Sequence, residues 1–198
     1  MKRFALVLTL LLAAESAFGV DLTPRYIDTF IDGITNRRLY FADGEKKIGV
    51  RVDRETRVEQ IGGGVGFRFE KFPDVMFQIK TSPLTPDQPF SGIPLERYRE
   101  AARRMVPPGA KGTQVVEEAE DPLPINQWKS YRITLACDLT DVPSRLVVTF
   151  LNLDEDQQLV LLTKSSERSF AEATQRSWQI IRTWQEFLPG DERPSGSN

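Results

Sequence analysis

The strongest constraint on the fold is the apolar pattern of residues 131–163, which predicts three consecutive strands. In Tyr131–Leu139 every second residue is apolar or aromatic, as in a strand with one buried face. Arg145–Leu153 is apolar on both faces, so we expect it near the centre of a sheet, covered on both sides. Leu159–Thr163 is again apolar. The connections between these strands are short, and short connections join antiparallel strands.

The segment after these strands predicts one long amphipathic helix, Phe170–Leu188. One stripe of its helical projection holds Phe170, Ala173, Ser177, Ile181, Trp184 and Leu188. Ser169 followed by Glu172 predicts a capping box at the start, and Pro189 ends the helix. The aromatic residues of this helix could form a ligand-binding box, but such a stripe is typical of a helix that covers a sheet. We therefore predict that Trp184 is a buried structural residue.

The rest of the chain predicts shorter elements. Strands are expected at Ile48–Val52, Phe67–Phe69 and Met76–Lys80 and from Val115 onward, and helices at Tyr26–Ile34 and Leu95–Val106. The glycines of residues 62–66 match neither a P-loop nor a dinucleotide fingerprint, because a strand follows them, so they indicate a turn. This order of elements predicts an α+β fold. Strands that are apolar on both faces predict a single antiparallel sheet with helices on both faces, a three-layer α/β/α sandwich.

Residues 1–19 have the pattern of a secretory signal peptide. Lys2 and Arg3 are followed by an apolar run and by a small-residue cleavage site that ends at Gly19. The run is about half the length that a bilayer span needs, and Val20 stands where a lipoprotein would have cysteine. We therefore expect an exported periplasmic or extracellular protein without a stable membrane anchor after cleavage. Residues 20–189 would form a single domain, and residues 190–198 a disordered polar tail.

The composition excludes several classes of chemistry. The chain has no histidine and a single cysteine, Cys137, so Ser-His-Asp and Cys-His mechanisms and histidine-ligated metal sites are ruled out. Carboxylate, Ser-Lys and tyrosine chemistry remain open. The net charge is −2, and removal of Lys2, Arg3 and Glu15 with the leader leaves about −3, which argues against nucleic acid as a partner. We expect no cofactor and no metal.

From about Lys47 to Leu188, this order of elements resembles the PsbP-like fold, which is shared with a small nuclear import factor that binds the Ran GTPase. The segments that carry the resemblance are Ile48–Val52, Tyr131–Leu135, Leu146–Leu151, Leu159–Thr163 and the closing helix with Phe170, Trp178, Ile181 and Trp184. Photosynthetic members assist an oxygen-evolving complex and others are binding or assembly proteins, so the resemblance implies a role of that kind. It places no functional residue on this chain, and the histidines of some photosynthetic members have no counterpart here.

The sequence thus favours an exported, non-catalytic binding or assembly factor, with another protein of the cell envelope as its partner. A carboxylate- or tyrosine-dependent hydrolase or lyase and a structural envelope component are the alternatives. The partner-binding candidates are Leu84, Phe90 and Ile93, which lie in the long proline-rich loop Ser82–Pro94. Long loops in compact domains are usually functional or disordered, and prolines lower the entropy cost of binding. The alternative is that these side chains tuck the loop against the edge of the sheet.

Overall fold

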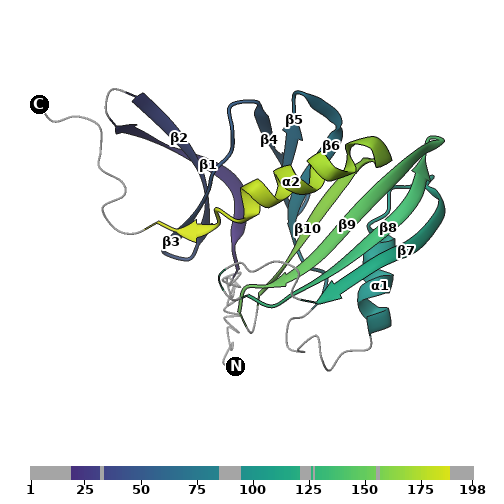
Figure 1. Ribbon diagram of the computed structural model, residues 1–198. Coiled ribbons are helices and arrows are strands. Elements are labelled where there is room, and N and C mark those ends of the chain that lie inside the picture. Colours follow the sequence, from purple (N-terminus) through teal and green to yellow (C-terminus); the bar gives the residue numbers. More distant parts are fainter. Residues whose placement is uncertain are drawn as a thin grey trace, which may run out of the picture.

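The computed structural model describes residues 19–31, 34–84, 95–120, 126, 128–154 and 157–187. These residues form eleven β-strands, two α-helices and one short 3-10 helix, and the strands build two antiparallel sheets (Figure 1). The expected leader, residues 1–19, lies outside this part of the chain except for Gly19, and the expected tail, residues 190–198, lies wholly outside it. Those boundaries remain predictions.

The larger sheet has seven strands in the order β4-β5-β6-β10-β9-β8-β7. They are β4 (Thr56–Ile61), β5 (Gly64–Phe69), β6 (Phe72–Thr81), β7 (Lys111–Glu120), β8 (Ser130–Leu139), β9 (Val142–Asn152) and β10 (Gln158–Ser166). β8, β9 and β10 confirm the three antiparallel strands predicted in residues 131–163. β10 is the middle strand and β9 is next to it, as expected for strands that are apolar on both faces.

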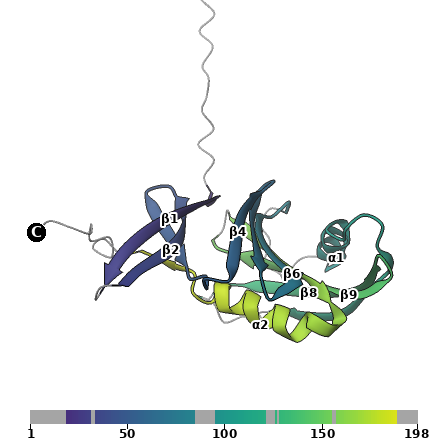
Figure 2. The ribbon, with the colours of Figure 1, turned by 90° about the horizontal axis from the view of Figure 1, so that it is seen from above.

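The smaller sheet has four strands in the order β1-β2-β3-β11. They are β1 (Asp21–Ile31), β2 (Ile34–Asp43), β3 (Lys46–Val50) and β11 (Gln185–Glu186). The β1–β2 hairpin extends away from the larger sheet (Figures 1 and 2), so the helix predicted at Tyr26–Ile34 is wrong. The apolar residues of this segment have a helical spacing, but they are mostly aromatic or β-branched and favour strands. The strand conformation is stabilised by the pairing of β1 with β2, which runs from Asp21 opposite Ala42 to Ile31 opposite Ile34.

The closing helix is shorter than predicted. After the 3-10 helix η2 (Glu167–Ser169), α2 spans Phe170–Ile181, and the chain then extends into β11, which pairs with β3. The hydroxyl of Thr183 donates to the carbonyl of Ile180 and accepts the backbone N–H of Arg51, so it competes with continuation of the helix. The predicted capping box is also wrong. Ser169 makes no side-chain cap hydrogen bond, and Glu172 pairs with Arg176 instead.

The predicted fold class, a single antiparallel sheet inside a three-layer α/β/α sandwich, is wrong. The described residues are mostly strand, form two sheets and include only two α-helices, α1 (Leu95–Arg104) and α2. The first three strands pair with one another and with β11 instead of joining the larger sheet. Each face of the larger sheet carries one short helix, which is not a helical layer (Figure 2). Neither helix is long and apolar enough to cross a membrane.

Two apolar cores lie on the two faces of the larger sheet, because neighbouring residues of its central strand point in opposite directions. On β10, Val160 and Leu162 join the core beneath α1, whereas Leu159 and Leu161 join the core beneath α2. The α2 core continues into the smaller sheet through Trp184, which is 3% exposed, as predicted for a structural residue. Its ring stacks on Phe41 of β2 at 5.5 Å between centroids. Cys137 is buried too, as expected of a small core residue.

Candidate functional site

Only the start of the predicted binding loop, Ser82–Leu84, belongs to the described residues. The backbone N–H of Ser82 donates to the carbonyl of Gln158 on β10 at 2.9 Å, and its hydroxyl donates to the amide oxygen of Gln158. Leu84 is half-buried against the core beneath α1. Phe90 and Ile93 lie outside the described residues, so this loop remains an untested candidate for partner binding.

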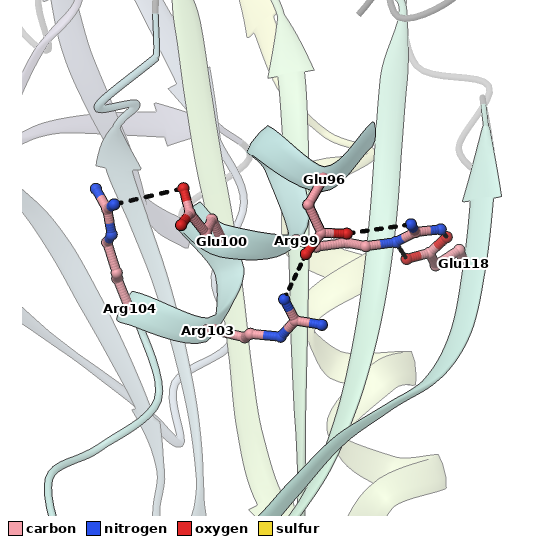
Figure 3. A network of polar contacts seen from close by, with 6 residues as sticks. All are labelled: Glu96, Arg99, Glu100, Arg103, Arg104 and Glu118. Atoms are coloured by element: carbon pink, nitrogen blue, oxygen red, sulfur yellow. Dashed lines mark hydrogen bonds and ion pairs between the residues drawn. The ribbon is translucent and has the colours of Figure 1, made fainter. Parts of the chain in front are cut away.

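A network of ion pairs joins α1 to β7 (Figure 3). The Arg99 guanidinium donates to both carboxylate oxygens of Glu118, at 2.6 and 2.7 Å. The Tyr131 hydroxyl, on β8, donates to Glu118 at 3.1 Å. The hydrogen bonds from Arg99 lower the pKa of Glu118 below its usual range, and burial raises the pKa of Tyr131 to about 12. The carboxylate is therefore ionised and the phenol neutral at physiological pH.

The other charges of α1 are mostly paired as well (Figure 3). Glu96 accepts from Arg103 at 2.7 Å and from Arg99 at 3.4 Å, and Arg104 lies 3.5 Å from Glu100. An open hollow of about 370 Å³ lies between α1 and β7. Its charged side chains form ion pairs within the chain, so we infer that this network holds α1 against the sheet.

A small cleft lies between α2 and strands β8 to β10. Its volume is about 50 Å³, and its lining consists of Phe77, Arg132, Val147, Thr149, Leu161, Thr163, Thr174, Ser177, Trp178 and Ile181. Arg132 donates from its Nη2 to Glu117 at 2.7 Å, while its buried Nε has no partner in the described part of the chain. The cleft has room for one small group beside a guanidinium, and it is far below the size of a typical ligand pocket.

A larger hollow of about 290 Å³ lies on the other side of α2. We call it the arginine hollow. It is bordered by the last turn of α2 and by the connection from β3 to β4, elements that can be followed in Figure 1. Its lining consists of Arg51, Val52, Asp53, Thr56, Phe69, Arg176, Gln179, Ile180, Arg182 and Thr183. Three arginines and one aspartate thus line the same space, and with Glu172, which pairs with Arg176, the charges of these residues sum to +1.

Arg176 forms a fixed part of the arginine hollow. Its guanidinium pairs with Asp53 at 3.1 Å and with Glu172 at 2.6 Å. It also lies over the aromatic rings of Phe72, at 4.8 Å, and Phe69, at 5.6 Å, in cation–π geometry. The charge of Arg176 is therefore used within the chain.

Arg51 and Arg182 differ from Arg176. Both are exposed, and their guanidinium groups make no hydrogen bond or ion pair with any described residue. Neither residue was predicted from the sequence as a site residue. The closeness of Arg51, Arg54 and Arg57 in the sequence is a signal that could have marked one side of the hollow. Nothing in the sequence brings Arg182 to the same place, because that needs α2 to end at Ile181.

Within the described ranges, no group of three or more histidine, cysteine, aspartate or glutamate side chains is placed to hold a metal ion. The arginine hollow is suited to the recognition of a charged group. It combines Arg51 and Arg182, which are unpaired among the described residues, with the fixed guanidinium of Arg176 and with threonine and apolar side chains.

No protein-family model matches the chain, and no curated protein sequence matches it. Among solved structures, cyanobacterial PsbP (CyanoP) from Synechocystis matches with 9% sequence identity over 88% of this chain and 96% of that chain, at a TM-score of 0.45. LpqN, involved in cell envelope biogenesis of Mycobacterium tuberculosis, matches with 7% identity over 84% of this chain and 92% of that chain, at 0.45. The Ran-binding protein Mog1p of Saccharomyces cerevisiae matches with 8% identity over 81% and 88%, at 0.33.

A structure from Bacteroides thetaiotaomicron matches with 10% identity over 74% of this chain, at a TM-score of 0.46, and this chain spans only 47% of that one. These likenesses concern the fold alone. The matched structures include PsbP and Mog1, in agreement with the diffuse resemblance to the PsbP-like fold.

Proposed function

We propose that the protein is an exported, non-catalytic binding or assembly factor whose partner is another protein of the cell envelope. The observation that carries this proposal is the arginine hollow. Arg51 and Arg182 are charged groups on a concave surface, and neither has a partner among the described residues. An exposed pair of charges that contributes no contact within the chain is suited to contact with another molecule.

The directions of the pKa shifts favour binding over the hydrolase or lyase alternative. A general acid needs a carboxyl group whose pKa is raised toward neutrality. Wherever a carboxyl pKa is clearly shifted in the described residues, it is lowered, chiefly by hydrogen bonds: Asp21, Asp28, Asp74, Glu96, Glu118 and Glu167. The pKa of Tyr131 is raised, away from a reactive phenolate. Five of these six carboxylates form ion pairs with arginine, whereas Asp74 accepts hydrogen bonds from Ser166.

Export is the part of this proposal that rests on residues 1–19. Val20 and Leu22 are already buried in the α2 core, at 6% and 5% exposure. Cleavage after Gly19 would leave both in place, whereas cleavage a few residues later would remove core side chains. We expect the mature chain to begin at Val20 or Asp21, and the burial of Val20 favours a start at Val20. Mass spectrometry of the exported protein tests this, and a membrane fraction that retains Met1–Gly19 would refute it.

The loop Ser82–Pro94 is the second candidate surface, and a pair of matched variants tests it. If the loop binds the partner, Phe90→Ala should leave the melting temperature nearly unchanged and abolish capture of the crosslinked partner from the native host. Leu84→Ala, at another candidate residue of the loop, gives the melting temperature expected when a loop side chain that packs on the core is lost, because Leu84 contacts the core beneath α1.

The opposite result for Phe90→Ala would identify the loop as a structural element. A Phe90→Ala protein that melts earlier and still captures the partner would show that the loop only closes the fold. Failure of the wild-type chain to capture any envelope protein would contradict the binding function itself.

A further inference from the structure

We propose that the arginine hollow binds an acidic segment of the partner protein, with carboxylates of aspartate or glutamate pairing with Arg51 and Arg182. This inference rests on the proposed binding function and specifies the chemistry of the partner. It also separates the surface that recognises charge, beside α2, from the loop Ser82–Pro94, which starts on the α1 side of the sheet.

The charges around the hollow leave a net positive site. Arg176 pairs with two carboxylates, Asp53 at 3.1 Å and Glu172 at 2.6 Å, so these three groups together carry one negative charge, and Arg51 and Arg182 bring the sum to one positive charge. Arg51 and Arg182 remain without a partner in the described chain, and Arg54 is exposed at the turn that follows Asp53. The whole chain carries −2, so two unpaired cations at one hollow run against the average charge of the molecule. Complementary charge on a partner is the direct way to satisfy them.

The backbone holds the two free arginines near each other before any partner arrives. The N–H of Arg51 donates to the hydroxyl of Thr183 at 2.8 Å, and Thr183 follows Arg182 directly. β11 then pairs with β3, with Gln185 opposite Gly49, which ties the segment after α2 to the strand that precedes Arg51. Two guanidinium groups fixed at a shared hollow lose less conformational freedom on binding than two on separate mobile loops.

The position of the hollow favours a carboxylate over a phosphate. It lies at the C-terminal end of α2, where the carbonyls of Trp178, Ile180 and Ile181 accept backbone N–H groups, and not at the N-terminus, where a helix has free N–H groups. Phosphate sites are instead typical of helix N-termini, where N–H groups point at the anion. Val52, Phe69 and Ile180 also line the hollow, so it can accept the methylene groups of a glutamate as well as its charge.

The test measures binding of a fluorescein-labelled oligoglutamate peptide to the mature protein by fluorescence anisotropy. At low ionic strength we expect the wild-type chain to bind and added salt to weaken the complex. The double variant Arg51→Gln/Arg182→Gln should bind about tenfold more weakly, since each exposed charge pair contributes up to about 1 kcal/mol. The matched control is Arg97→Gln/Arg104→Gln, which removes the same charge from the exposed side of α1 and should bind like the wild type.

Three outcomes overturn the inference. One is that oligoglutamate does not bind at low ionic strength, and another is that both double variants lose affinity equally, which indicates unspecific charge attraction. The third is that inorganic phosphate or vesicles with phosphatidylglycerol bind at the arginine hollow and oligoglutamate does not. In each of these cases, continued capture of an envelope protein by the wild-type chain would show that the proposed binding function holds and that the partner binds at a surface other than the arginine hollow.

Discussion

The two faces of the larger sheet use arginine in different ways. On the α1 side, Arg99, Arg103 and Arg104 each pair with a glutamate, and only Arg97 has no partner in the described chain. Beside α2, Arg176 is paired and stacked, but Arg51 and Arg182 line a hollow and have no partner in the part of the chain that the structure describes. The difference teaches that arginine content alone does not indicate a binding surface. In our proposal the binding surface is indicated instead by arginines on a concave surface that have no partner among the described residues.

The largest effect should come from the α2 core, where the two sheets meet. Trp184→Ala removes a side chain that is 3% exposed, stacked on Phe41 and edge-on to Trp128, and it should lower the free energy of unfolding by roughly 3–5 kcal/mol. Chemical denaturation measures the loss. Trp178→Ala is the control, because Trp178 is only half-buried and should cost less. A loss under about 1 kcal/mol for Trp184→Ala would mean that the contacts of Trp184 do not stabilise the core beneath α2.

A smaller and pH-dependent effect is expected on the α1 side. The pKa of Glu118 is lowered in the folded protein by hydrogen bonds from Arg99. A carboxyl group with a lowered folded-state pKa stabilises the fold above its unfolded pKa of about 4.3, and this stability is lost as the pH falls through the folded pKa. Glu118→Gln should therefore cost about 1 kcal/mol at pH 7, since solvent screens part of the pair, and almost nothing at strongly acidic pH.

Denaturation curves at several pH values check this prediction. Glu100→Gln serves as the control, because Glu100 reaches Arg104 only at 3.5 Å and both side chains are largely exposed. Equal pH profiles for Glu118→Gln and the wild type would show that the pair between α1 and β7 does not stabilise the fold.

The smallest effect on stability should come from the unpaired arginines. Arg51→Gln/Arg182→Gln removes no contact within the described chain and should change the free energy of unfolding by less than about 0.5 kcal/mol. Arg176→Gln, in the same hollow, loses its ion pairs and its stacking on Phe69 and Phe72 and should cost about 1–2 kcal/mol. Comparable losses for both variants would mean that Arg51 and Arg182 also stabilise the fold.

Most strands of the larger sheet were accessible from the sequence, whereas in the smaller sheet only β3 was, through the predicted strand Ile48–Val52. Alternation and two-sided apolar strands predicted β8, β9 and β10, and an apolar stripe predicted the burial of Trp184. β11 is only two residues long and has no strand pattern of its own. It pairs with β3 where Gly49 lacks a side chain that would collide with the ring of Phe187. Such a contact between distant segments leaves no local signal.

The candidate site, too, could be predicted from the sequence only in part. Arg51, Arg54 and Arg57 are visible as a basic run, but Arg182 joins Arg51 only because α2 ends early and the chain turns toward β3. The loop residues Leu84, Phe90 and Ile93 were selected from composition, and they stay a prediction. The sequence therefore favoured a binding protein and did not identify the arginine hollow, which we propose as the surface that recognises charge.

One comparison of two double variants tests most directly whether the α1 side uses its arginines for stability and the α2 side for binding. Melting temperature and oligoglutamate affinity are measured for Arg99→Gln/Arg103→Gln and for Arg51→Gln/Arg182→Gln. We predict that Arg99→Gln/Arg103→Gln melts at a lower temperature than the wild type and binds oligoglutamate equally well. Arg51→Gln/Arg182→Gln should melt like the wild type and bind oligoglutamate about tenfold more weakly. The reverse pattern, or equal changes in both variants, would contradict this prediction.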